Sequence, residues 1–315
     1  MSSDSHNHTH FGDLANQTTK RLALSLGLTA AFVIVEIIAG IIGNSLALLT
    51  DAAHNFTDVI ALGLSWYAVK LATQPAHAGK TFGYHRVGIL VALVNSTTLV
   101  LIALGIFYEA YQRFLSPPEV DSTILIGVGA LAFLINAGTA WLVKSGSEND
   151  LNLRSTFLHL MGDVMSTLGA VIAGIIIAFT NWNWLDPLVS VLIGVFILWN
   201  AWGILRQSIH ILLESTPESI DMDSMVNDLL KVDGVCGVHD LHVWSINENL
   251  RALSAHIITN DIHVSAGVSI QRDLNEILTH KYNIRHATLQ LECEGYHENI
   301  LFCNISEHHH EHVEI

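Results

Sequence analysis

Charged side chains are scarce in this chain, and basic ones especially so: 14 Lys and Arg face 29 Asp and Glu, for a formal net charge of -15. Such a balance cannot neutralise a row of phosphates, which excludes nucleic acid as a partner. Charged residues make up only 14%, half of the residues are hydrophobic and mean hydropathy is +0.43, a composition typical of membrane proteins. The acidic balance and the 19 His indicate cations as partners.

Cysteine is also rare. The sequence has Cys236, Cys293 and Cys303, an odd number with no CxxC pair. This excludes a disulfide framework and fits a reducing compartment for the C-terminal part. The polar start "MSSDSHNHTHFGD" is unlike a cleaved signal peptide, so the first hydrophobic segment is expected to direct the chain to the membrane.

Long apolar segments fill the first two thirds of the chain, and a bilayer span needs about 20 such residues. Six spans are predicted, over 21–43, 46–70, 87–114, 122–144, 153–179 and 186–206. If both termini lie on one side, that side receives every Lys and Arg near the span ends except Arg113. The bias places both termini and the C-terminal domain in the cytoplasm of a multi-pass protein in the bilayer.

The domain organisation follows from these spans. The sequence predicts a His-containing cytoplasmic tail (1–19), an all-α six-helix transmembrane domain (20–208), a cytoplasmic α+β domain (209–295) and a His-rich C-terminal tail (296–315). Short His-rich tracts bind metal weakly and reversibly. The His of the two tails are His6, His8, His10, His308, His309, His310 and His312.

Ionisable residues interrupt the second and fifth spans in a matched HxxxD pattern. His54 and Asp58 share one helix face, and so do His159 and Asp163. The second span enters from the outer side and the fifth from the inner side, so both pairs fall near mid-bilayer. Two His and two Asp there predict a tetrahedral site that suits zinc, whereas harder cations prefer more oxygens and copper(I) prefers sulfur. Helix packing explains a single polar residue better than it explains two matched pairs.

Two further acids lie within the spans. Asp51 shares the face of His54, which favours a role in supporting the ligands or carrying a proton over direct metal binding. Glu36, in the first span, fits a proton relay or a hydrogen bond between helices equally well.

Past Thr216 the pattern becomes that of a soluble αββαβ domain. Two segments have a helical period, "PESIDMDSMVNDLLKV", with Thr216 or Ser219 as its cap, and "SAGVSIQRDLNEILTHKY". Three others alternate as strands: "GVHDLHVWSI", "LRALSAHIIT" and "IRHATLQLEC". A hairpin turning at 247–248 puts His239 across from His256, within reach of one ion, whereas a one-residue slip puts them on opposite faces.

Five segments resemble the cation diffusion facilitators, in their zinc-transporting branch: "SLALLTDAAHNFTDV", "FGYHRVGILVALVN", "FLHLMGDVMSTLGAVIAG", "DPLVSVLIGVFILWNAW" and "VHDLHVWS". The resemblance covers about residues 20–295. It implies six spans, a homodimer, a cytoplasmic ferredoxin-like domain, and zinc export in exchange for protons. His54, Asp58, His159 and Asp163 match the family's transport-site positions. A His rather than an Asp at the first of these positions is expected to favour zinc over cadmium. The short "KSGSENDL" loop resembles bacterial members, and so implies a bacterial inner membrane.

The resemblance implies two further features. His239, His256 and Glu292 fall at the places of a cytoplasmic metal site, which would take Zn2+. Some relatives have another His ligand where this chain has Gly267, and His286 is a candidate substitute. In addition, a cation and an acid of the family, at the positions of Arg86 and Glu214, form a charge interlock between the spans and the cytoplasmic domain.

Two other classes of function remain as alternatives. A membrane-bound metal sensor would explain the cytoplasmic His but not the matched ligands at mid-membrane. An intramembrane metalloenzyme needs an open coordination position and a general base, as in HExxH, and the sequence has no such motif, so an enzyme is not expected. The leading hypothesis is a zinc/proton antiporter, with cadmium, cobalt or manganese as alternative cargo.

Overall fold

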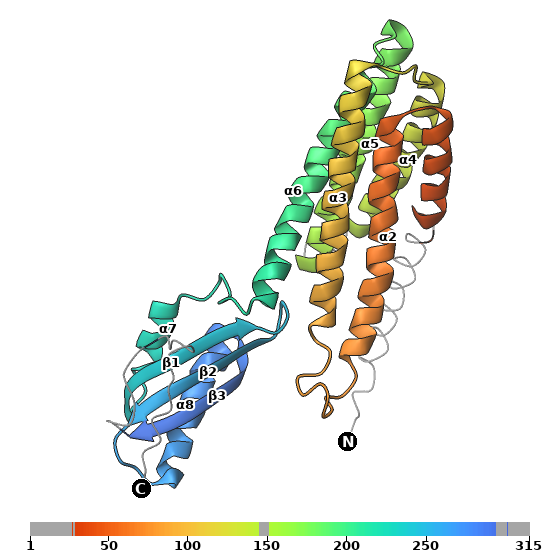
Figure 1. Ribbon diagram of the computed structural model, residues 1–315. Helices are drawn as coiled ribbons and strands as arrows, with labels where there is room; N and C mark the ends of the chain where they lie inside the picture. Colours follow the sequence, from red (N-terminus) through yellow and green to blue (C-terminus); the bar gives the residue numbers. More distant parts are fainter. Residues whose placement is uncertain (1–26, 28, 145–150, 294–300, 302–315) are drawn as a thin grey trace, which may run out of the picture. The chain divides into compact units, whose positions relative to one another are not determined.

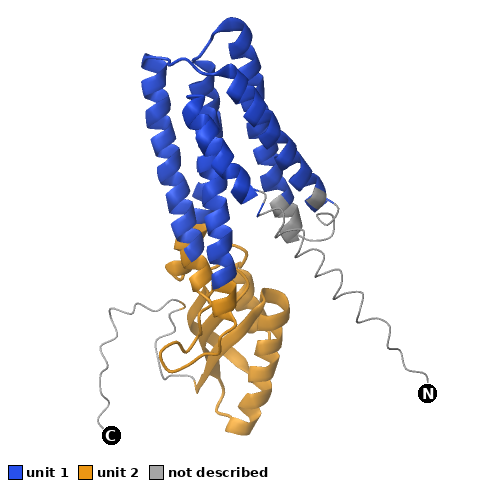
Figure 2. Cartoon of the chain, turned by 90° about the vertical axis from the view of Figure 1, so that its right-hand side faces the viewer, with its two compact units in different colours: residues 1–67, 91–205 blue, residues 68–90, 206–315 orange. Residues whose placement is uncertain are grey.

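A computed structural model describes residues 27, 29–144, 151–293 and 301 of the chain. The two predicted tails and Cys303 lie outside these residues. The chain forms two compact units (Figure 2), one from residues 1–67 and 91–205, the other from residues 68–90 and 206–315.

Long helices build the first unit, and three of them also include residues assigned to the second unit: the end of α2, the start of α3 and the end of α6 (Figure 1). They are the first helix, Thr29–Ile42 in its described part, then α2 (Leu46–Ala72), α3 (Val87–Leu115), α4 (Ser122–Lys144), α5 (Leu151–Thr180) and α6 (Leu185–Leu212). Each helix overlaps one predicted span, and α6 runs on past the predicted end at 206.

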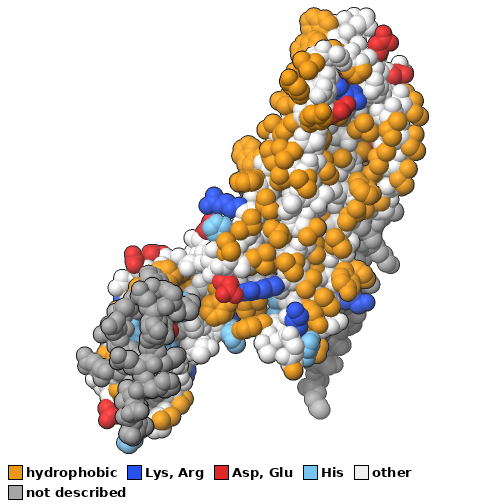
Figure 3. All heavy atoms as spheres, in the orientation of Figure 1, with side chains coloured by type: hydrophobic (Ala, Val, Ile, Leu, Met, Phe, Trp, Pro, Cys, Tyr) orange, Lys and Arg blue, Asp and Glu red, His pale blue; other side chains and the backbone are white. Residues whose placement is uncertain are grey.

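Four of the described helices are long and apolar enough to cross a membrane: α3, most of α4 and α5, and α6. The helix α2 is as long but less apolar, because Asp51, His54 and Asp58 interrupt it. Hydrophobic side chains cover the face of the helical unit seen in Figure 3. Large ones such as Phe179 and Trp199 are 85% and 78% exposed, as expected of residues that face lipid rather than water.

The second unit contains the predicted αββαβ domain. Its elements are α7 (Met222–Leu229), β1 (Val235–Ser245), β2 (Arg251–Thr259), α8 (Val264–Tyr282) and β3 (Ile284–Cys293). Strand β2 lies in the middle of the sheet, antiparallel to β1 and parallel to β3. A parallel pair needs a crossover connection, and α8 supplies it. The α+β fold expected from the sequence is confirmed.

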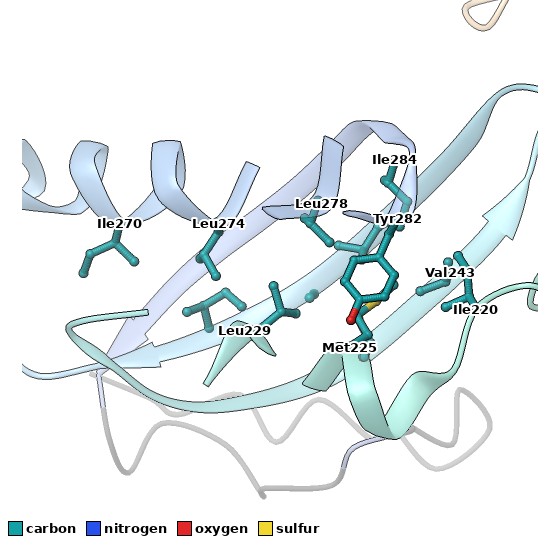
Figure 4. Close-up of a cluster of buried hydrophobic side chains, with 13 residues drawn as sticks. Ile220, Met225, Leu229, Val243, Ile270, Leu274, Leu278, Tyr282 and Ile284 are labelled. Atoms are coloured by element: carbon teal, nitrogen blue, oxygen red, sulfur yellow. The ribbon is translucent and has the colours of Figure 1, made fainter. Parts of the chain in front are cut away.

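The core of this domain lies between the sheet and its two helices (Figure 4). Leu229 of α7 and Leu274 and Leu278 of α8 are fully buried there. At its edge, Asp228 of α7 accepts hydrogen bonds from Lys281 and from the Tyr282 hydroxyl. Both contacts hold the pKa of Asp228 below its usual range, and the hydrogen bond from Lys281 has the larger effect. These contacts tie α7 to the end of α8.

The predicted cap of the first helix of this domain was wrong. Helix α7 begins at Met222, and its N-cap is Asp221, whose side chain accepts a hydrogen bond from the Asp223 backbone at 3.2 Å. Asp is among the best N-cap residues, and here its extended backbone suits the position. The Ser219 hydroxyl instead accepts a hydrogen bond from Arg251.

Candidate metal sites

The two HxxxD pairs converge in the helical unit, His54 and Asp58 from α2 and His159 and Asp163 from α5. The Nε2 atom of His54 lies 3.6 Å from Asp58 Oδ2 and 3.4 Å from Asp163 Oδ1. The Nε2 atom of His159 lies 3.0 Å from Asp58 Oδ2 and 3.8 Å from Asp163 Oδ2. Each imidazole therefore faces one carboxylate of its own helix and one of the other helix.

These spacings are those of donors around one small ion. A tetrahedral zinc holds nitrogen and oxygen donors at about 2.0–2.2 Å, which separates neighbouring donors by about 3.3–3.6 Å. The four observed distances centre on that range. Ligand atoms of His54, His159 and Asp163 all lie within 4.8 Å of one another. Asp58 joins them through its contacts with both imidazoles.

The imidazole of His54 is buried without a hydrogen bond. Its residue is 5% exposed, and within the described part of the chain neither ring nitrogen has a hydrogen-bond partner. Leaving buried polar atoms unsatisfied is costly, so such atoms call for an explanation. A cation between its Nε2 atom and the two carboxylates would supply the missing partner.

The two extra acids of the spans, Glu36 and Asp51, are buried next to each other. Asp51 is 4% exposed and accepts a hydrogen bond from the Asn55 side chain at 3.1 Å. Glu36 is fully buried and faces Asp51 and Asn55, but neither of its carboxylate oxygens has hydrogen-bonding geometry with a described residue. The sequence pattern found both acids but missed Asn55, which lies one residue after His54 and donates the hydrogen bond to Asp51.

A second cluster lies on the sheet of the other unit. His239 of β1 pairs directly with His256 of β2, as predicted, and their rings meet edge to face at 5.0 Å. The turn differs from the predicted one, however. Continued from Ser245 and Arg251, the register would place His239 opposite Ile257, and a register shift between His239 and His242 restores the pairing with His256. Glu292 of β3 lies between them: its Oε2 is 3.0 Å from His239 Nε2 and its Oε1 is 2.9 Å from His256 Nδ1. Glu292 is 8% exposed, and a buried carboxylate beside two imidazoles is a donor set that suits zinc.

A bulge in β1 adds one acid that the sequence analysis missed. The register shifts between His239 and His242, and Asp240 there has a φ of 47°. Its carboxylate lies 3.0 Å from His242 Nε2 and 3.5 Å from His256 Nε2. Strict alternation would direct Asp240 away from His239, so only the bulge brings it to His256.

The structure does not bring His286 to this cluster. It pairs with Ala252 near the start of β3, whereas Glu292 lies near the end of that strand, about 20 Å further along. The ring of His286 instead contacts Phe82. A Cβ atom at Gly267 would lie 2.7 Å from Leu291 Cδ1, so the His of some relatives would fit here only if the Leu291 side chain moved.

The predicted charge pair is present within the second unit. The guanidinium of Arg86 donates a hydrogen bond to Glu214 Oε1 at 2.7 Å. The two side chains are 39% and 59% exposed, so solvent reaches the pair. Water and salt screen such a pair, which limits its contribution to stability.

Apolar helices long enough to cross a membrane, joined to an α+β domain, are the architecture of a multi-pass membrane protein with a separate C-terminal domain. Residues 22–213 match the cation efflux transmembrane domain, and residues 217–294 match the cytoplasmic domain of cation efflux proteins. The chain belongs to the cation efflux family, a family of transporters rather than enzymes, which confirms the resemblance to the cation diffusion facilitators.

Known relatives match along nearly the whole chain. The "Cadmium, cobalt and zinc/H(+)-K(+) antiporter" of Bacillus subtilis (strain 168) is 38% identical over 97% of this chain and 99% of its own. The "Zinc transporter ZitB" of Escherichia coli (strain K12) is 35% identical with the same coverage. A solved structure, the metal-bound C-terminal domain of the CzcD transporter, is 29% identical over 23% of this chain and 99% of its own, with a TM-score of 0.22.

Proposed function

We propose that this protein exports zinc from the cytoplasm in exchange for protons. One observation supports this most: His54 Nε2 is buried, lacks a hydrogen bond within the described residues and lies within 3.6 Å of two carboxylates. His54, Asp58, His159 and Asp163 would hold the ion by their side chains. Zinc appears in the names of both relatives, and the name of the Bacillus subtilis protein also includes H(+) and K(+) exchange.

The charge of the site gives the exchange its physical basis. Two ionised Asp offset a divalent cation, and two neutral His complete its coordination. An empty site with both carboxylates ionised would leave two negative charges in a low-dielectric region. Protons that bind the ligands in the absence of zinc remove that cost, and they also compete with zinc for the same atoms. Loading from the cytoplasm and release outside then follow if the site opens to each side in turn.

Other divalent metals are the second candidate. The printed name of the Bacillus subtilis relative includes cadmium and cobalt as well as zinc. Imidazole and carboxylate donors also suit cobalt, while cadmium is larger and tolerates a softer, wider site. The relatives named above come from bacteria, which favours a bacterial inner (plasma) membrane for this protein.

The cytoplasmic cluster is proposed as a separate zinc site. His239, His256 and Glu292 would hold the ion, and Asp240 lies close enough to His256 to orient it. A bound ion joins all three strands, because each ligand comes from a different one. We also propose a homodimer joined through this domain.

The direct test is metal flux into proteoliposomes from purified protein. A transporter moves zinc across the membrane, whereas a sensor binds zinc without moving it. Running zinc, cadmium, cobalt and manganese in parallel separates the zinc antiporter from a broader metal antiporter.

A further inference from the structure

The carboxylate of Asp186 is buried at one end of the helical unit and belongs to neither metal cluster. It is the second residue of α6 and is 0% exposed. Its Oδ2 atom accepts a hydrogen bond from the backbone N–H of Leu46 at 2.7 Å, and its Oδ1 atom accepts one from Ala47 at 3.2 Å. The Ser45 hydroxyl donates a third, at 2.6 Å.

These bonds make Asp186 a cap for a helix to which it does not belong. Leu46 and Ala47 are the first two residues of α2, and their N–H groups have no acceptor within that helix. Ser45, at the usual capping position, accepts from Leu48 at 3.3 Å, and Asp186 serves the remaining donors. We call these contacts of Asp186 with Ser45, Leu46 and Ala47 the α2 cap. A carboxylate is favoured there by the positive end of the helix dipole.

The cation Arg113 of α3 reinforces the α2 cap. Its guanidinium lies 3.7 Å from Asp186 Oδ2 and donates a hydrogen bond to the Asn44 carbonyl at 2.7 Å. Asn44 has a φ of 50° in the tight turn that precedes α2. The start of α2 is therefore held by polar contacts from both α3 and α6, and the carboxylate of Asp186 among them is fully buried.

Helix α6 also contacts the other ligand helix closely. A Cβ atom on Gly162, the residue before the ligand Asp163, would lie 2.5 Å from the ring of Phe196 of α6. A larger residue at this position would require the Phe196 ring to move. Helix α6 thus meets α5 beside its ligand and meets α2 through the cap, although it contributes none of the four proposed ligands.

We propose that Asp186 is a positioning residue for the transport site. The cap fixes the depth and rotation of α2, and His54 lies about 12 Å along α2 from Leu46. A small rotation at the capped end therefore moves His54 and Asp58 relative to His159 and Asp163. This inference rests on the proposed function, because it takes those four residues as the site.

The test compares purified full-length protein with its Asp186→Asn and Asp186→Ala variants in lipid nanodiscs and proteoliposomes. Two quantities are measured: the KM for zinc flux, and the visible absorption of bound cobalt(II), which reports tetrahedral coordination. The Asp163→Ala protein shows how much cobalt absorption comes from sites other than the transport site. This background is subtracted from the absorption of every other sample. The matched control is Asp121→Asn, because Asp121 caps α4, which carries no proposed ligand, by accepting from Thr123 and Ile124.

We expect both Asp186 variants to raise the KM by about tenfold or more, the size seen when a residue that orients metal ligands is lost. The subtracted cobalt absorption should weaken, more in Asp186→Ala than in Asp186→Asn. The Asp121→Asn control should change neither. Unchanged KM and absorption in a folded Asp186→Asn protein would overturn the inference, and so would failure of that conservative variant to fold, which would assign Asp186 to folding alone. If Asp163→Ala itself leaves flux and cobalt absorption intact, the proposed transport site fails instead.

Discussion

The Nε2 atom of His159 lies 3.0 Å from Oδ2 of Asp58, so an imidazole of α5 faces a carboxylate of α2. The reverse contact, from His54 of α2 to Asp163 of α5, is 3.4 Å. Each helix therefore contributes one nitrogen donor and one oxygen donor to the site. Each nitrogen faces the oxygen donor of its own helix and the oxygen donor of the other helix. An ion bound among them would be held by both helices, and a relative movement of α2 and α5 would change all of its donors at once.

Removal of one ligand should abolish transport. In Asp163→Ala, the three remaining donors cannot replace the water that zinc loses on entering the membrane. We expect zinc affinity at the site to fall by more than about 100-fold, beyond the 10–100-fold cost of losing a residue that merely orients a ligand. Flux in proteoliposomes measures the effect, with Asp121→Asn as the control. Normal flux from a folded Asp163→Ala protein would rule out the assignment.

Replacement of an imidazole by a carboxylate should change selectivity. His54→Asp makes the site more anionic and removes a nitrogen donor, so discrimination between zinc and cadmium should relax. The ratio of cadmium flux to zinc flux measures this directly. We expect the ratio to rise, and an unchanged ratio would show that His54 does not set selectivity.

Sequence reasoning was strongest where a periodic pattern carried the information. The HxxxD spacing placed His54 with Asp58 and His159 with Asp163. Hydropathy placed both ends of α2 to α5 to within two residues, whereas α6 continues past its predicted end at 206. The pairing of His239 with His256 was predicted as well, but the structure reaches it through the bulge in β1 and not through the predicted turn alone.

The sequence was weaker where the geometry is irregular or long-range. Asp240 reaches His256 through a bulge that breaks strand alternation. Asp186 caps α2 across a separation of 140 residues. Its position at the start of α6, just before Pro187, resembles an ordinary helix start, and nothing local indicates which helix it caps.

The cytoplasmic cluster should make the stability of the domain depend on zinc. Glu292→Gln removes the carboxylate that joins His239 and His256, so added zinc should stabilise the variant much less. A ligand at 100 times its Kd stabilises a fold by about 2.7 kcal/mol, a shift that a melting curve resolves. The control is Glu276→Gln, an exposed acid on α8. Equal zinc-induced shifts in Tm for Glu292→Gln and the unmodified protein would contradict the site.

The pair of Arg86 and Glu214 should contribute little. With side chains 39% and 59% exposed, we expect a coupling energy of about 0.2–1 kcal/mol. A double-mutant cycle on Arg86→Ala and Glu214→Ala, read as the thermal stability of the protein, measures it. Strictly additive effects would show that the two residues are uncoupled and that no charge interlock operates.

The central claim, exchange of zinc for protons at one site, is tested most directly by zinc flux under an imposed pH gradient. Proteoliposomes are prepared with equal zinc on both sides and with either an acidic or an alkaline interior. Exchange for protons predicts net zinc movement toward the acidic side, reversal of its direction when the gradient is reversed, and loss of both movements in Asp163→Ala. Apparent zinc affinity should also fall as pH drops through the imidazole range near 6.5, because protons displace the metal from its ligands. Zinc flux that follows only its own concentration gradient, at any pH difference, would contradict the exchange and indicate a uniporter.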